Sequence, residues 1–191
     1  MRILVTGGNG HLGYNLIAAL LARGHAVHAT LRSLDHPGPV ARVRALGDVT
    51  LHAADIRDPG QMHAALANVD VLFHVAAVYS TTDRTREQEM LETAVTGTEV
   101  VLRAAASRGV RRVIMTSSVV TLPLTPRGAP PSTEDDWNPD LRVGYFRAKV
   151  ESERRAWALA DELGLRLTTI LPAGIIGPGF VRSTPTTDIV R

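Results

Sequence analysis

The sequence predicts an α/β protein with a doubly wound parallel sheet and helices on both of its faces. Six short apolar runs of strand length alternate along the chain with segments whose apolar residues recur at helical spacing. This alternation implies parallel strands joined by right-handed crossovers, because each helix returns the chain to the same end of the sheet. A glycine-rich turn between the first strand and the first helix, Gly7 to Gly13, is typical of such sheets.

In the N-terminal half, glycine and proline mark where the elements end. Gly24 and Gly47 follow the first two helices, as residues just past a helix end often do. Residues 35–39 are expected to form a loop, and Asp58 and Pro59 supply the start signals of a third helix. The expected strands are 3–5, 25–31 and 49–53, and the expected helices are 12–23, 40–46 and 59–66.

The C-terminal half repeats the alternation with longer helices. Residues 70–75 form a run that is apolar apart from Asp70 and His74, which is typical of a strand buried on both faces. The stretch 123–139 is rich in proline and acidic residues and predicts a loop, and Gly109 and Gly164 end the two helices. The expected elements are strand 70–75, helix 85–108, strand 111–116, helix 141–163 and strand 165–171.

Composition excludes several functional classes. The 191 residues suffice for one domain with a sizeable core, and 45% hydrophobic with 21% charged residues is ordinary for a globular protein. The net charge is only +2, with no basic tract suited to nucleic acid. The absence of cysteine excludes disulfides and thiolate metal sites, and the scattered histidines predict no metal. No apolar run is long enough for a signal peptide or a membrane span, so we expect a cytoplasmic protein without membrane contact.

The glycines of the first turn each have a distinct expected role. Gly7 allows a tight turn, Gly10 allows a pyrophosphate to approach the backbone, and Gly13 lets the helix pack on the strand. The free N–H groups and positive dipole end of the helix would face the phosphates. The turn therefore predicts a dinucleotide site.

The end of the second strand bears on which dinucleotide is bound. An acid there would bond the 2′-hydroxyl of the adenosine ribose, whereas an arginine accommodates a 2′-phosphate. Here the strand ends at Arg32, and the nearest acid is Asp35. The sequence therefore favours NADP over NAD.

Tyr145 and Lys149 are the candidate catalytic pair. They are four residues apart in a helical segment, so their side chains share one face. Lys149 is the only lysine in an arginine-rich chain, which indicates a site that arginine cannot serve. An ammonium beside a phenol stabilises the phenolate, which lets tyrosine exchange a proton with a substrate oxygen. Ser117 and Ser118 follow the fifth strand, where a hydroxyl could bond that same oxygen.

Taken together, these motifs resemble the extended short-chain dehydrogenase/reductase superfamily, of the NAD-dependent epimerase/dehydratase type. Within it, the chain is most similar to dihydroflavonol 4-reductase-type NADP-dependent carbonyl reductases, through 29–32, 134–137 and 156–157. The resemblance covers nearly the whole chain. Its motifs are residues 6–13, 55–56, 73–77, 116–118, 145–149, 171–172 and 177–179.

The resemblance implies a Rossmann-type fold and a role for each candidate. Tyr145 would be the acid/base, Lys149 would hold the nicotinamide ribose, and Ser118 would orient the carbonyl. Together with the glycine turn and Arg32, the resemblance implies that the cofactor-binding residues are Gly7, Asn9, Gly10, His11, Leu12, Gly13, Arg32, Asp55, Ile56, Val75, Ala76, Ala77, Ser117, Tyr145, Lys149, Pro172, Ala173, Gly174 and Ile175.

The chain departs from the family in two places. Many extended members have an asparagine where this chain has Ala94, which puts a proton relay through that position in doubt. Family members also continue for well over a hundred residues and use that part for the substrate. We therefore expect an NAD(P)-binding domain at 1–171 and the start of a truncated substrate-binding region at 172–191, with the C-terminal substrate lobe largely absent.

The leading functional hypothesis is an NADP(H)-dependent oxidoreductase that reduces a ketone or aldehyde to an alcohol. Its partner would be a small carbonyl or alcohol substrate, and a homodimer is compatible with the family. The alternatives are a nucleotide-sugar epimerase or dehydratase with bound NAD, and a non-catalytic NADP(H)-binding module. An intact Ser118, Tyr145 and Lys149 argue against the non-catalytic module, because a sensor does not need them.

Overall fold

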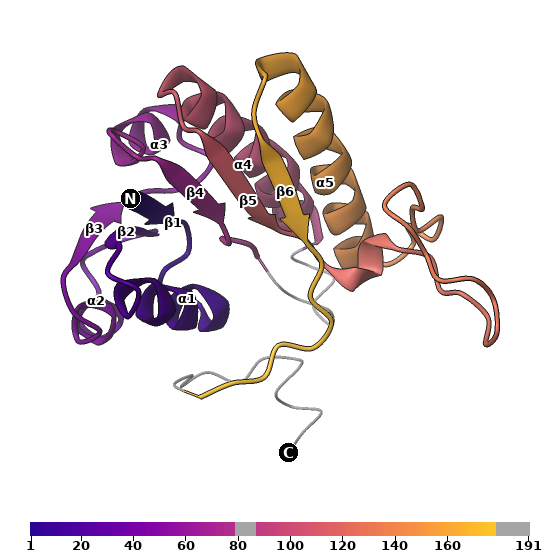
Figure 1. Cartoon of the computed structure of the whole chain (residues 1–191), viewed down its shortest axis with the longest axis horizontal. Helices are drawn as coiled ribbons and strands as arrows, with labels where there is room; N and C mark the ends of the chain where they lie inside the picture. The colour runs from indigo at the N-terminus through magenta and orange to yellow at the C-terminus, as the bar shows by residue number, and fades with distance from the viewer. Residues whose placement is uncertain (79–86, 179–191) are drawn as a thin grey trace.

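A computed structural model describes residues 1–78 and 87–178 and shows one parallel six-stranded sheet. The strand order is β3-β2-β1-β4-β5-β6, so the chain winds outward from β1 in one direction and then from β4 in the other (Figure 1). Every neighbouring pair is parallel. The predicted doubly wound sheet is therefore confirmed.

The strands and helices alternate in the expected order. The strands are β1 Arg2–Val5, β2 Ala26–Leu31, β3 Val49–Ala53, β4 Val71–His74, β5 Arg112–Thr116 and β6 Leu167–Ile170. The helices are α1 His11–Leu21, α2 Pro37–Arg44, α3 Pro59–Ala65, α4 Glu87–Ser107 and α5 Gly144–Leu163, with a short 3₁₀ turn, η2, at Val119–Thr121. Residues 85 and 86, where we expected the fourth helix to begin, and residues 179–191 lie outside the described part.

Two predicted helix starts are wrong, and each error has a local cause. Helix α2 begins at Pro37, inside the stretch expected to be a loop, because a proline in the first turn gives up an N–H that has no helical partner anyway. Helix α5 begins at Gly144 rather than at residue 141. The Asp140 carboxylate accepts the backbone N–H of Arg142 at 3.1 Å and pairs with its side chain, which holds these residues in a turn.

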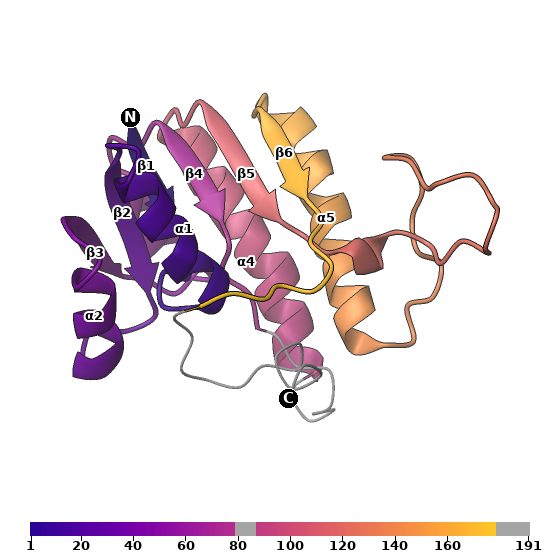
Figure 2. The ribbon, with the colours of Figure 1, turned by 60° about the horizontal axis from the view of Figure 1, so that its bottom comes forward.

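Helices cover both faces of the sheet, and the alternation of side chains along β1 shows how. Ile3 and Val5 lie in the cluster with α1 and α2, whereas Leu4 lies in the cluster with α3, α4 and α5. Figures 1 and 2 show these two groups of helices on opposite sides of the sheet. No helix in the described residues is long and apolar enough to cross a membrane.

A buried hydroxyl–imidazole chain connects β1, β4 and α4. The Thr6 Oγ1 accepts the backbone N–H groups of Val75 and Ala76, both at 3.0 Å, and lies 3.0 Å from His74 Nδ1. Because two N–H groups use its lone pairs, Thr6 must donate its hydrogen to His74. The other ring nitrogen, Nε2, then carries the proton and donates to Thr98 Oγ1 at 3.4 Å. His74 is therefore neutral and bonded at both nitrogens.

Helix α4 approaches the end of β3 closely because residue 97 lacks a side chain. A Cβ at Gly97 would lie 2.6 Å from Ile56 Cδ1 and 2.9 Å from its Cγ1. Ile56 is only 7% exposed and belongs to the core cluster beneath α3 and α4. The glycine therefore sets the spacing between this helix and the sheet.

We expect Gly97→Ala to destabilise the fold by about 1–3 kcal/mol, because the added methyl overpacks against Ile56. The matched control is Gly38→Ala in α2, where a Cβ would meet no described residue within 4 Å. This control should be neutral or stabilising, because alanine is the better helix former. Urea unfolding measures both variants. Adding Ile56→Val to Gly97→Ala should restore part of the loss, and equal stability of the two glycine variants would contradict the argument.

The buried His74 should make stability depend on pH. Burial, assisted by the charge of Lys149, lowers the pKa of His74 to about 4. Since the pKa of an unfolded histidine is near 6.5, stability is complete above that pH and falls as acid protonates the unfolded chain first. Between pH 7 and pH 5 the wild type should lose about 2 kcal/mol more than His74→Gln in urea unfolding. His28 and His52 are present in both proteins, so parallel pH profiles would count against the proposed role of His74.

Candidate active site

The glycine turn lies at the carboxyl edge of the sheet, between β1 and α1. Gly7 adopts φ +70, and a Cβ there would lie 2.9 Å from the Ala76 Cα, so the turn touches the chain that leaves β4. A Cβ at Gly13 would lie 2.3 Å from the Gly7 carbonyl oxygen, so the helix packs directly on the turn. At Gly10 the Gly7 oxygen, at 3.3 Å, is the one contact of such a Cβ within 4 Å in the described part of the chain, apart from its chain neighbours and its own helix backbone. The turn is therefore packed at its two ends and open in the middle.

Gly8 is a fourth required glycine that the sequence analysis did not single out. A Cβ there would lie 2.8 Å from Ala29 Cβ and 3.0 Å from Ile17 Cδ1. The N–H of Gly8 donates to the Thr30 carbonyl at 2.9 Å, which joins the turn to β2. The spacing of Gly7, Gly10 and Gly13 matches a known pattern, whereas the need at Gly8 arises only from packing across the sheet.

The start of α1 has no side-chain cap, and two residues of the segment after β6 contact this helix. No side chain caps the helix at Gly10, and the first N–H groups of a helix have no partner within it. The His11 Nε2 lies 3.1 Å from the Gly177 carbonyl, and Asn15 Nδ2 donates to the Pro178 carbonyl at 3.2 Å. Asn9 is exposed and Leu12 is partly buried. Residues 177–178 thus lie beside the first turns of α1.

Three further residues that were predicted to contact the cofactor follow β2 and β3, and they differ in their surroundings. Arg32 is exposed at the end of β2. Asp55 accepts two side-chain bonds from Arg57, at 3.1 and 2.7 Å, and this pairing lowers the pKa of Asp55 to about 2, with a smaller contribution from Arg32. Ile56 turns into the core against Gly97, so its side chain does not face this edge.

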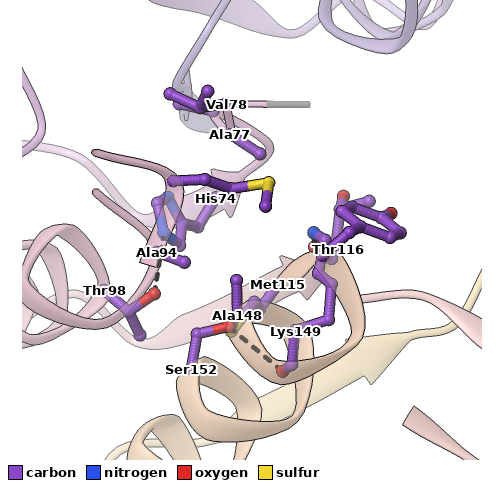
Figure 3. A pocket seen from close by; sticks show the side chains of 13 residues that line it. His74, Ala77, Val78, Ala94, Thr98, Met115, Thr116, Ala148, Lys149 and Ser152 are labelled. Atoms are coloured by element: carbon purple, nitrogen blue, oxygen red, sulfur yellow. Dashed lines mark hydrogen bonds between the residues drawn. The ribbon is translucent and has the colours of Figure 1, made fainter. Parts of the chain in front are cut away.

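A narrow pocket at the carboxyl ends of β4 and β5 brings several predicted residues together. Its lining includes Ala76, Ala77, Tyr145 and Lys149. Figure 3 shows Lys149 opposite His74, with α4 residues on one side and β5 residues on the other. Val75, which precedes Ala76, is tied to Thr6 by its backbone N–H. The remaining lining residues are Val78, Met90, Ala94, Thr98, Met115, Thr116, Ala148 and Ser152.

Lys149 is a buried cation in this pocket. It is 9% exposed, and its Nζ donates to the Thr116 carbonyl at 3.1 Å. Burial lowers the pKa of Lys149 to about 8, and the negative charge of Glu153 acts in the opposite direction. The ammonium is therefore close to losing its proton just above neutral pH.

The two serines after β5 have other partners. Ser117 is buried, and its hydroxyl donates to Glu153 Oε2 at 2.5 Å. Ser118 caps η2, where its Oγ accepts the backbone N–H of Val120 at 3.4 Å. Neither serine lines the pocket that contains Tyr145 and Lys149.

The segment after β6 begins beside the same edge. The Pro172 carbonyl accepts the N–H of Val119 at 3.0 Å, which joins this segment to η2. Pro172 and Ile175 are partly buried, whereas Ala173 and Gly174 are exposed. None of these four residues belongs to the lining of the pocket.

Two residues of the site escaped the sequence analysis as functional residues. His74 was noted only as part of a motif, and its bonds to Thr6 and Thr98 depend on strand pairing. Glu153 stands four residues after Lys149, which is the only sequence signal for it, but Glu151 lies nearby on the same charged helix. Only the structure separates the buried Glu153 from the more exposed Glu151. In the described part of the chain, no three His, Cys, Asp or Glu side chains are grouped so that they could hold a metal ion.

Comparison with known proteins agrees with this geometry. Residues 3–190 match the model of the NAD dependent epimerase/dehydratase family. The chain is 38% identical over 183 residues to sterol demethylase protein B of Methylococcus capsulatus, covering 93% of this chain and 52% of that protein. It is 34% identical over 200 residues to dihydroflavonol 4-reductase of Zea mays, covering 96% and 55%.

One solved structure illustrates the shared fold. Yeast methylglyoxal/isovaleraldehyde reductase, complexed with NADPH, superposes with a TM-score of 0.80 over 95% of this chain and 60% of that one, at 20% identity. The chain spans about half the length of the curated relatives that it matches. From the family match over residues 3–190, this chain belongs to the NAD-dependent epimerase/dehydratase family.

Proposed function

We propose that this chain is the cofactor-binding and catalytic part of an NADP(H)-dependent oxidoreductase that reduces a ketone or aldehyde to an alcohol. The observation that carries the proposal is the pocket at the carboxyl edge, where the buried Lys149 and Tyr145 lie beside the Ala76–Ala77 segment. A phenol and an ammonium held in one pocket suit proton transfer to a substrate oxygen.

The residues of the turn fit a dinucleotide. The open space at Gly10 and the uncapped start of α1 together suit a pyrophosphate, which would accept bonds from the helix N–H groups. A side chain at residue 10 would project into that space. When bound, the nicotinamide would supply the hydride for the carbonyl carbon.

The protein residues would supply the proton and the orientation. Tyr145 would donate its hydroxyl proton to the carbonyl oxygen, and the Lys149 ammonium would stabilise the phenolate that remains. Ser118 would orient the carbonyl. Its bond from Val120 uses an oxygen lone pair and not the hydroxyl hydrogen, so Ser118 can still donate to a substrate oxygen.

The preference for NADP over NAD rests on Arg32. It is exposed at the end of β2, where the adenosine ribose of a bound dinucleotide would lie. Asp55, whose charge interacts with that of Arg32, is already paired with Arg57. Relatives with reductase names, such as dihydroflavonol 4-reductase of Zea mays, support the same class of reaction.

We expect the protein to bind NADPH more tightly than NADH, and Arg32→Ala to narrow the difference about ten- to a hundredfold. A charge-assisted hydrogen bond from arginine to phosphate changes a binding constant by about this factor. Fluorescence titration of both cofactors measures it. Arg44→Ala, at an exposed arginine of α2, is the control and should leave the ratio unchanged. Equal affinities of the wild type for the two cofactors would refute the preference.

We expect Tyr145→Phe to reduce carbonyl reduction about a hundredfold or more while NADPH affinity stays nearly constant, because only the proton donor is removed. Lys149→Arg should impair both, since a planar guanidinium does not replace a compact ammonium. The measurement is NADPH oxidation with simple ketones and aldehydes on the full-length protein. Tyr14→Phe, which changes a tyrosine that packs against Arg42 instead, is the control. Activity close to wild type in Tyr145→Phe would rule out the proposed acid.

A further inference from the structure

Glu153 is a buried carboxylate in a place where a carboxylate is costly. It is 3% exposed on α5, and its Oε2 accepts the hydroxyl of Ser117 at 2.5 Å. Glutamate is almost never fully buried unless it is paired, because removing its charge from water is unfavourable. One hydroxyl satisfies part of that need, so a second partner for the charge should be close.

The geometry points to Lys149 as the opposite charge, which acts through space, since each side chain has its own hydrogen-bond partner. The two side chains are four residues apart on α5, so they project from the same face of the helix. Both are also attached to consecutive residues at the end of β5, since Lys149 donates to the Thr116 carbonyl and Glu153 accepts from Ser117. The negative charge of Glu153 raises the pKa of Lys149 against the effect of burial.

We propose that Glu153 is a positioning residue that keeps the buried Lys149 in its charged form, and that Ser117 holds Glu153 in the place where it does so. The consequence for catalysis rests on the function proposed above for Lys149. The electrostatic coupling itself does not depend on that function.

Among the described residues that line the pocket with Lys149, no other side chain supplies this charge. On α5, Tyr145 lines the same pocket and is neutral when it holds its proton. On β4, His74 is neutral, because it accepts from Thr6 and donates to Thr98. The residues that α4 contributes to the pocket, Met90, Ala94 and Thr98, do not ionise, and β5 contributes Met115 and Thr116.

The sequence itself provides a direct probe. Because Lys149 is the only lysine in the chain, protein made with ¹³C-labelled lysine shows one side-chain signal, and the Cε shift of that signal follows its protonation. The titration needs neither substrate nor cofactor. It therefore tests the coupling on the 191-residue chain whether or not that chain reduces a carbonyl.

We expect Glu153→Gln to lower the pKa of Lys149 by about one pH unit, because it removes the negative charge that raises this pKa against the effect of burial. Glu151→Gln is the matched control: it removes the same charge two residues away, from a side chain paired with Arg147, and should leave the Lys149 titration unchanged. A Lys149 titration that is the same in Glu153→Gln and wild type would overturn the proposal.

Ser117→Ala tests whether the position of the Glu153 carboxylate matters when its charge is kept. It keeps the carboxylate but removes the bond that holds it, so the Lys149 pKa should fall by less than in Glu153→Gln. If the Lys149 pKa fell equally in Ser117→Ala and Glu153→Gln, packing and not the charge of Glu153 would set this pKa, and the proposal would be overturned. Near-UV circular dichroism shows whether Glu153→Gln folds. If it does not fold, Ser117→Ala becomes the deciding variant, and an unchanged Lys149 pKa in that variant would overturn the proposal.

NADPH affinity measured against pH then connects the coupling to the proposed function. If Lys149 binds the cofactor as an ammonium, affinity is lost as pH rises through its pKa, and in Glu153→Gln this loss should move to lower pH by the same amount as the NMR titration. A shifted NMR titration with an unshifted affinity profile would support the role of Glu153 and contradict the role proposed for Lys149.

Discussion

The close contact between the glycine turn and the chain leaving β4 is the constraint on which the site depends. Gly7 touches the backbone of Ala76, and the Thr6 hydroxyl binds the N–H groups of Val75 and Ala76. These contacts join β1 and β4, the two strands between which the direction of winding reverses. A doubly wound sheet binds its ligand at this reversal, because the helices that follow the two strands lie on opposite faces and leave a crevice between them.

The same edge contains an unusual number of buried polar groups. His74, Ser117, Lys149 and Glu153 are each less than 10% exposed, and they lie on β4, just after β5 and on α5. Each has a hydrogen-bond partner in the structure, as buried polar groups require. Because the local dielectric is low, a change in one charge is felt by its neighbours more strongly than it would be in water. A substitution that changes the packing at this edge should therefore also change the electrostatic environment of these buried groups.

Local signals predicted much of the fold. Asp58 and Pro59 start α3 as expected, with the Asp58 carboxylate accepting the N–H of Gln61 at 3.0 Å. Gly164 ends α5 with φ +65. The errors at the starts of α2 and α5 arose where proline in a first turn, or an Asp140–Arg142 turn, decided the boundary. Ile56 shows what a motif leaves open: its contact with the cofactor stays a prediction, whereas the packing of its side chain into the space that Gly97 opens in α4 is visible only in the structure.

The sequence by itself determined the order of strands and helices, the glycine spacing of the first turn and the shared helical face of Tyr145 and Lys149. Each of these follows from residues within a few positions of one another, where backbone preference and helical periodicity decide the outcome. Only the tertiary structure decided that Thr6 binds His74, 68 residues away, and that Ser117 binds Glu153, 36 residues away. Such pairs depend on strand register and on which helix covers which face, because a buried polar group takes the partner that packing brings to it.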